Sequence, residues 1–274
     1  MADAGEQSGG GSMFLASSLL ALALAALIGW YLVQQQSAAI SQKSLAIARG
    51  TTTRARGQRV VITGPPGTGK TALWLHLRFT ATSAGRAVPR TQTSLAVNEA
   101  DAFVDETCAC LVDVPGHPRF ARERDEQLRG ARAVVFVLDG AAVARDVRPT
   151  AEALYDVLAS RHVQASECPV LVVCNKQDDP LALANSRAKL LLEAEFDVLR
   201  ASRQAGLDSL QAARDADDAA AEERAADYLG VDGKPFAFED LALPVQFNEA
   251  SMMVGHDAGG LEHIERWIAD ALHA

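Results

Sequence analysis

Short apolar runs alternate with amphipathic stretches along the chain from residue 58 to residue 274. The apolar runs predict strands at Arg59–Thr63, Thr107–Asp113, Ala133–Asp139, Val170–Asn175 and Val245–Ala250. Helical patterns follow at Lys70–Thr80, Arg119–Arg129, Thr150–Arg161, Ser186–Leu199 and Leu261–Leu272. Strands that alternate with helices are typical of a three-layer α/β domain with a mostly parallel sheet, and we predict this fold for residues 58–274.

A second hydrophobic pattern lies near the N-terminus. Residues 13–33 carry no charge, and Trp30 and Tyr31 stand at one end of this run. A helix of this length reaches about 31 Å, which is enough to cross the hydrocarbon core of a bilayer. A cleaved signal peptide is the alternative, but the run is longer than usual and no Lys or Arg precedes it. We predict a transmembrane helix at 13–33 after a short tail at 1–12.

The charges around this span predict its orientation. Five basic residues follow it by residue 59, so residues 1–59 carry a net charge of +3 and residues 60–274 carry −12. The positive-inside rule then places the domain at 58–274 in the cytosol, behind a linker or stalk at 34–57. A domain this acidic lacks the basic surface that non-specific nucleic-acid binding needs.

Two compositional features concern the domain itself. An acidic, alanine-rich insertion is predicted around 203–235, because residues 208–227 hold seven acids against two arginines. The four cysteines are too few for a disulfide scaffold, and we expect buried free thiols in a reducing, cytosol-facing compartment. They are Cys108, Cys110, Cys168 and Cys174.

The strongest motif is a glycine-rich loop between the first strand and the first helix. Residues 64–71 read G-P-P-G-T-G-K-T, which satisfies the phosphate-loop pattern G-x-x-x-x-G-K-[ST] in its required strand–loop–helix context. Lys70 would neutralise phosphate charge, and the Thr71 hydroxyl would bind Mg²⁺. The predicted nucleotide-binding residues here are Gly64, Pro65, Pro66, Gly67, Thr68, Gly69, Lys70, Thr71 and Ala72.

A second motif indicates which base is bound. Asn175-Lys176-Gln177-Asp178 follows an apolar strand and matches the guanine-specificity pattern N-K-x-D. The carboxylate of Asp178 can accept hydrogen bonds from guanine N1–H and the exocyclic amine, which adenine does not offer. The stem of Lys176 would pack along the base, and Asn175 would brace the phosphate loop.

A third motif, Asp113-Val114-Pro115-Gly116-His117, follows another strand. Asp113 would hold Mg²⁺ through water, and the Gly116 N–H would reach the γ-phosphate as part of a nucleotide switch. His117 is a candidate to orient the attacking water, or a replacement for the usual glutamine that does not support hydrolysis.

Two further loops complete the predicted site. In the polar stretch Thr91, Gln92, Thr93 and Ser94, a threonine would close over Mg²⁺ and the γ-phosphate, and we assign the metal contact to Thr93. After the last strand, Ser251 and Met252 occupy the place where GTPases contact the guanine O6 through backbone N–H groups.

Taken together, these residues resemble the Ras-like small GTPases of the Arf/Sar branch, and within it the β subunits of the signal recognition particle receptor. The resemblance rests on the N-terminal span and on Thr91–Ser94, Asp113–His117, Ala131–Asp139 and Cys174–Asp178. It implies a P-loop GTPase fold that binds GTP and Mg²⁺ and hydrolyses GTP slowly.

The resemblance also implies a cellular role. It predicts a single-pass protein of the endoplasmic reticulum membrane with a lumenal tail at 1–12. Such a protein would hold the receptor α subunit at the membrane in a GTP-dependent way during co-translational targeting. The partner surface would then lie at Thr91–Ser94 and Gly116–Arg122.

Three alternatives compete with this interpretation. An Arf-like trafficking GTPase would cycle between GTP and GDP, but Ala2 stands where N-myristoylation needs glycine. A membrane AAA-type ATPase has a similar phosphate loop but needs adjacent Asp-Glu, whereas Gly140 follows Asp139 here. A scaffold without nucleotide is disfavoured by the intact phosphate-loop and base-binding residues.

Overall fold

The computed structural model describes residues 58–79, 91, 94–105, 107–211, 228–231, 233–253 and 259–274. The predicted tail, membrane span and linker at 1–57 lie outside these residues. Across the described ranges, no helix combines the length and the apolar character that a membrane crossing requires.

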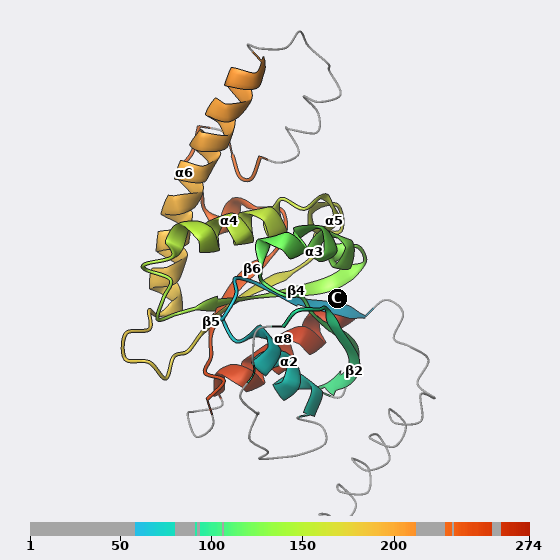
Figure 1. The fold of residues 1–274 in the computed structure, drawn as a ribbon. Coiled ribbons are helices and arrows are strands. Elements are labelled where there is room, and N and C mark those ends of the chain that lie inside the picture. The colour runs from blue at the N-terminus through green and yellow to red at the C-terminus, as the bar shows by residue number, and fades with distance from the viewer. Residues whose placement is uncertain are drawn as a thin grey trace, which may run out of the picture. The chain divides into compact units, whose positions relative to one another are not determined.

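Six strands form one sheet in the order β2-β3-β1-β4-β5-β6 (Figure 1). Their bounds are β1 Arg59–Thr63, β2 Asn98–Val104, β3 Thr107–Asp113, β4 Ala131–Asp139, β5 Val170–Asn175 and β6 Val245–Glu249. All neighbours are parallel except β2 and β3, which pair antiparallel. The predicted mostly parallel α/β fold is therefore confirmed.

Helices cover both faces of this sheet (Figure 1). One face packs against α2 and α8, whose bounds are Lys70–Phe79 and Gly259–His273. The other face packs against α3, α4, α5 and α6, whose bounds are Ala121–Leu128, Val147–Leu158, Arg161–Ala165 and Asn185–Gln211. Two short 3₁₀ helices, η1 at Pro118–Phe120 and η2 at Phe238–Asp240, lie in connections.

The central strands carry an apolar core on each face because successive side chains point to opposite sides. On β1, Val61 belongs to the cluster that includes residues of α4 and α6, whereas Val60 and Ile62 belong to the cluster that includes residues of α2 and α8. Strands β1, β4 and β5 are thus buried on both faces, which explains their continuous apolar runs.

An aromatic cluster attaches the segment after the acidic insertion to α6. Phe196 is fully buried, and its ring lies 4.7 Å from that of Phe236 and 5.4 Å from that of Phe238. Tyr155 on α4 adds a fourth ring at 5.3 Å from Phe196. Phe236 and Phe238 therefore belong to the folded core of the domain.

Several predicted element bounds differ from the structure. Strand β2 was not predicted, and the helix expected at Arg119–Arg129 is split into η1 and α3 because Pro118 opens a 3₁₀ turn. Helix α6 runs on to Gln211 instead of ending at Leu199, so the first part of the predicted insertion is helical. Residues 212–227 lie outside the described part of the chain, and there the insertion stays a prediction.

All four cysteines are free thiols, and three of them are buried as predicted, with Cys108 half-buried. Burial raises the pKa of Cys110 and Cys174 to about 12 and that of Cys168 to about 11. These thiols are therefore uncharged and unreactive at neutral pH.

Candidate nucleotide-binding site

Four loops meet at one edge of the sheet, because the carboxyl ends of parallel strands lie on the same side. They follow β1, β3, β5 and β6, and they contain the phosphate loop, the Asp113 motif, the Asn175 motif and the Ser251 loop. Topology thus brings together motifs that are up to 187 positions apart in sequence, from Gly64 to Ser251.

The phosphate loop is shaped by three glycines with positive φ. Gly64, Gly67 and Gly69 have φ values of 138°, 76° and 96°, a region that other residues adopt only with strain. A Cβ on Gly64 would lie 2.2 Å from the carbonyl oxygen of Val137 on β4. The loop leads directly into helix α2 at Lys70, so its N–H groups and the helix N-terminus form an anion-binding turn.

Lys70 lies folded under this loop. Its side chain is buried, and its Nζ donates a hydrogen bond to the carbonyl oxygen of Pro65 at 2.6 Å. Burial lowers the pKa of Lys70 to about 8, while the nearby carboxylate of Asp113 acts in the opposite direction. Among the described residues, no anionic group lies within hydrogen-bond distance of this ammonium. A bound phosphate group would supply such a partner.

The hydroxyl and carboxylate oxygens that Mg²⁺ prefers converge beside Lys70. Thr71 Oγ1 donates to Asp113 Oδ2 at 2.8 Å and lies 2.9 Å from Ser94 Oγ. Asp113 is fully buried, and its Oδ1 has no partner among the described groups. A buried carboxylate oxygen without a partner is costly unless a cation or its bound water completes the site, so these residues fit Mg²⁺.

The base-binding loop is connected to the phosphate loop. Asn175 Nδ2 donates to the carbonyl oxygen of Thr68 at 2.7 Å, which is the bracing contact predicted for Asn175. Lys176 has a left-handed backbone with φ of 66°, and its Nζ lies 2.5 Å from Asp139 Oδ2. Asn175 and Lys176 are therefore each held against a neighbouring loop.

The loop after β6 joins the same arrangement. Ser251 is buried, and its Oγ donates to Asp178 Oδ1 at 2.6 Å, which orients that carboxylate. The backbone adds two bonds, from Ala250 N to Cys174 O and from Gln177 N to Ala250 O. Met252 lies near the phosphate loop, since a Cβ on Gly69 would be 3.9 Å from its Cγ.

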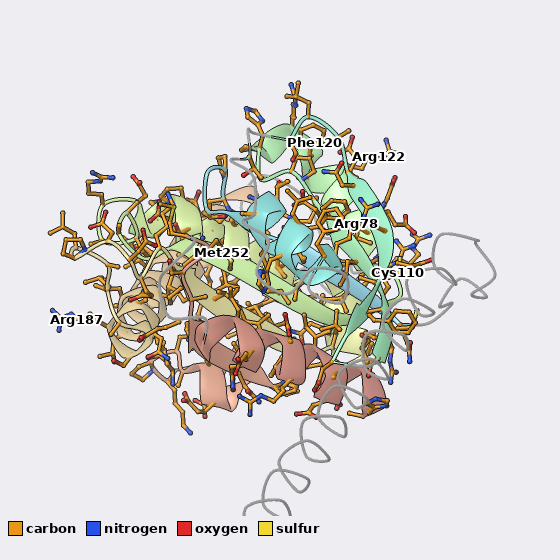
Figure 2. All side chains as sticks on the ribbon, turned by 90° about the horizontal axis from the view of Figure 1, so that it is seen from below. Arg78, Cys110, Phe120, Arg122, Arg187 and Met252 are labelled. Atoms are coloured by element: carbon orange, nitrogen blue, oxygen red, sulfur yellow. The ribbon has the colours of Figure 1, made fainter. Side chains whose placement is uncertain are left out.

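Gly116 and His117, the last two residues of the Asp113 motif, have different surroundings. Gly116 abuts the phosphate loop, because a Cβ there would lie 2.3 Å from the carbonyl oxygen of Gly64. His117 is exposed, and its Nδ1 accepts a hydrogen bond from Arg119 N that caps η1. After this turn, Phe120 and Arg122 lie at the periphery of the domain (Figure 2). The predicted role of His117 in positioning water stays a prediction.

The predicted switch segment is described only in part. Thr91 is exposed, Gln92 and Thr93 lie outside the described residues, and Ser94 contacts Thr71 as given above. The remaining predicted residues, Pro66, Gly67 and Ala72, lie in the phosphate loop and the first turn of α2.

Two residues near the site were not predicted. Asn98 Nδ2 donates to Asp113 Oδ2 at 3.2 Å, and Asp139 contacts Lys176. Asn98 opens the strand that the sequence pattern missed. Asp139 ends a predicted strand at the same sheet edge as Asn175, a position that could have drawn attention to it.

The comparisons with known proteins agree with this geometry. The profile of the family described as "Signal recognition particle receptor beta subunit" matches residues 55–245. The chain belongs to this family. The resemblance stated from the motifs is thereby confirmed, and the AAA-type ATPase alternative is set aside.

Relatives in several organisms carry the name signal recognition particle receptor subunit beta, and two of them illustrate the match. The protein of Mus musculus is 35% identical over 163 residues, which cover 58% of this chain and 57% of the relative. That of Dictyostelium discoideum is 32% identical over 198 residues, which cover 72% and 63%. The chain thus spans less than two thirds of the length of these relatives.

Solved structures show the same fold. The mammalian SRP receptor matches with 31% identity and a TM-score of 0.60, covering 78% of this chain and 99% of that chain. The SRP receptor structure of Chaetomium thermophilum described as SRb-GDP-Mg matches with 28% identity and a TM-score of 0.57, covering 80% and 100%. A small GTPase of Trypanosoma brucei shares the fold at 14% identity and a TM-score of 0.52. The domain therefore has the small GTPase fold.

Proposed function

We propose that the domain at 58–274 binds GTP and GDP with Mg²⁺ and acts as a guanine-nucleotide switch. The observation that carries this proposal is the position of the Asp178 carboxylate. Ser251 orients this carboxylate by a hydrogen bond, and Asn175 of the same loop is hydrogen-bonded to the phosphate loop. A relative with 28% identity is described with GDP and Mg bound, which supports the same ligands here.

Each group has a role in this proposal. The phosphate loop and Lys70 bind the phosphates, Thr71 and Asp113 hold Mg²⁺ directly or through water, and Asp178 reads the guanine edge. Ser94 stands next to Thr71 and supplies a further oxygen on the metal side. Gly116 lies against the phosphate loop, where a γ-phosphate would displace it and change the conformation of the loop.

The family also supports a proposal about the cellular role. In the proposed role, the residues at 13–33 anchor the chain in the endoplasmic reticulum membrane and the cytosolic domain holds the receptor α subunit when GTP is bound. Support comes from the uncharged run and the basic residues after it, and from family membership. Slow hydrolysis is part of this proposal, because a long-lived GTP state would keep the partner at the membrane.

The test is to identify the nucleotide that the purified protein carries. We expect guanine nucleotide at about one equivalent in wild-type protein after denaturation and chromatography, and a large loss in Thr71→Asn. Bound GTP would support a slow switch that tethers its partner. Bound GDP would support a protein that turns GTP over. Adenine nucleotide would contradict the assignment of Asp178.

A further inference from the structure

Asp139, the last residue of β4, uses both of its carboxylate oxygens in the structure. Oδ1 accepts hydrogen bonds from the N–H groups of Ala141 and Ala142 at 3.0 and 3.2 Å, which closes the turn after the strand. Oδ2 lies 2.5 Å from Lys176 Nζ, in an ion pair with side chains 20% and 41% exposed. One carboxylate therefore ties two loops together at the sheet edge.

The residue after Asp139 strengthens this connection. Gly140 N donates to the carbonyl oxygen of Asn175 at 2.8 Å, and its own carbonyl oxygen accepts from Leu183 N at 3.0 Å. A Cβ on Gly140 would lie 2.8 Å from that Asn175 oxygen, so the two loops approach as closely as glycine permits. The dipeptide at 139–140 thus holds Asn175 by its backbone and Lys176 by its side chain.

Lys176 needs such support for two reasons. Its backbone has a φ of 66°, which is sterically unfavourable for a residue with a Cβ and persists only when its surroundings fix it. Its long side chain loses considerable rotamer freedom when it is held in one place. An ion pair at the tip fixes the direction of the stem while leaving the apolar part of that stem available to a ligand.

The geometry points to Asp139 as a positioning residue for the base subsite. Its ion pair with the Lys176 ammonium fixes the direction of the lysine side chain. The methylene groups of that side chain can then pack against the face of a guanine ring. This inference rests on the proposed function, because it assigns a role within the same nucleotide site. Asp139 itself does not touch the base. It acts through Lys176.

The experiment measures the release of a fluorescent GDP from the full chain. We expect Asp139→Asn to release GDP about three- to tenfold faster, since the turn keeps an acceptor but the ion pair is lost. Asp156→Asn is the matched control, because Asp156 on α4 is a half-exposed carboxylate paired with Arg124 on α3 and Arg203 on α6. That control should release GDP at the wild-type rate.

A double-mutant cycle separates positioning from a general structural role. Lys176→Met keeps an apolar stem and removes the ammonium, so adding Asp139→Asn in that background should change the rate by less than about twofold. The inference is overturned if Asp139→Asn releases GDP at the wild-type rate, or if it accelerates release equally in both backgrounds. A wild-type chain that binds no guanine nucleotide would overturn the proposed function together with this inference, whereas the former outcomes overturn the inference alone.

Discussion

The side-chain amide of Asn175 donates a hydrogen bond to the backbone carbonyl of Thr68, across 107 positions of sequence, at 2.7 Å. This bond joins the base-binding loop to the phosphate loop. Gly69 makes the approach possible, because a Cβ there would lie 2.3 Å from Asn175 Nδ2. The two ends of the nucleotide site are thus held at a fixed spacing by contacts within the protein.

Gly69→Ala should separate these two loops. We expect the affinity for GDP to fall at least tenfold, because the new methyl group displaces the Asn175 amide. Gly130→Ala is the control, since Gly130 has a similar φ of 78° but has no atom within 4 Å of the added Cβ. Both variants should lose about 1 kcal/mol of stability from backbone strain. Equal GDP affinity in the two variants would contradict the proposed spacing, as measured by fluorescence titration and urea unfolding.

Asp178→Asn should change base preference. The amide presents a donor toward the guanine edge and loses one acceptor, so GTP affinity should fall by about a hundredfold or more while xanthosine triphosphate becomes the better ligand. Ser251→Ala should weaken GTP binding by a smaller factor, about three- to tenfold, because it only removes the hydrogen bond that orients the carboxylate. Competition titrations with GTP and xanthosine triphosphate measure the two affinities in each variant. An unchanged preference for GTP in Asp178→Asn would show that Asp178 does not bind the base.

Nucleotide affinity should fall above pH 8. The pKa of Lys70 is about 8 in the free protein, and bound phosphate raises it, so binding takes up a proton wherever the free lysine is neutral. Below pH 8 the lysine is already charged and affinity is highest, and at pH 9 we expect about a tenfold lower affinity than at pH 7. Lys70→Met is the control, because it lacks the titrating lysine. Any pH dependence of affinity that remains in this variant comes from other groups, such as the guanine base. The same pH dependence in wild type and variant would argue against this linkage.

The sequence predicted the central strands well because they are buried on both faces. Arg59–Thr63, Thr107–Asp113 and Val170–Asn175 have the predicted bounds, since an apolar run between polar residues leaves little ambiguity. Strand β2 at Asn98–Val104 was missed because it is an edge strand whose pattern includes Glu99 and Asp101. Its only described partner is β3, and pairing rather than its own composition makes it a strand.

The candidate site was predictable where motif residues follow strands, and not where contacts depend on loop geometry. The phosphate loop, Asp113 and Asn175–Asp178 come together as the parallel topology requires. The link from Asp139 to Lys176 depends on how two loops pack, which no spacing in the sequence encodes. The contact of Ser94 with Thr71 likewise depends on the path of a polar loop.

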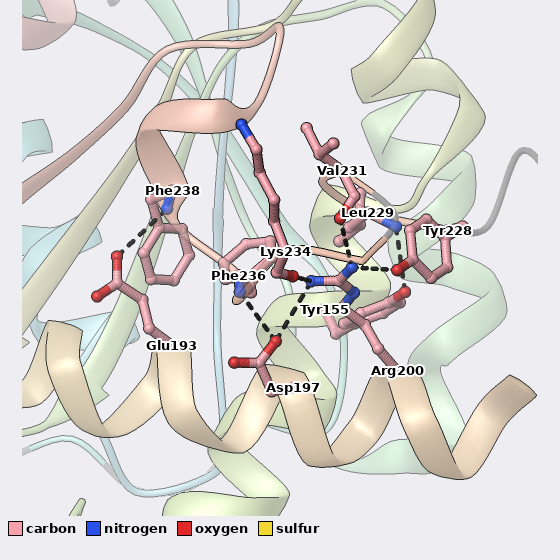
Figure 3. A network of polar contacts seen from close by, with 10 residues as sticks. All are labelled: Tyr155, Glu193, Asp197, Arg200, Tyr228, Leu229, Val231, Lys234, Phe236 and Phe238. Atoms are coloured by element: carbon pink, nitrogen blue, oxygen red, sulfur yellow. Dashed lines mark hydrogen bonds and ion pairs between the residues drawn. The ribbon is translucent and has the colours of Figure 1, made fainter.

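Arg200 gives a prediction about stability away from the site. Arg200 is 5% exposed, and its guanidinium donates to Val231 O at 2.8 Å, to Lys234 O at 3.2 Å and to Tyr228 Oη (Figure 3). It therefore fastens the last part of the predicted acidic insertion to α6, next to the aromatic cluster around Phe196.

Arg200→Met should lower the free energy of unfolding by about 2–4 kcal/mol, because the hydrogen bonds of a buried guanidinium are lost while the apolar volume is largely kept. Arg148→Met is the matched control on α4. Arg148 is half-exposed and pairs with Glu152 one turn away and with Glu195 on α6, and ion pairs of a solvated guanidinium contribute little, so we expect a loss of at most about 1 kcal/mol. Urea unfolding measures both values, and GDP affinity measured well below the midpoint should stay at the wild-type level in each. Equal stabilities would contradict this role of Arg200, and a loss of GDP affinity in Arg200→Met would show that the contacts of Arg200 are coupled to the nucleotide site.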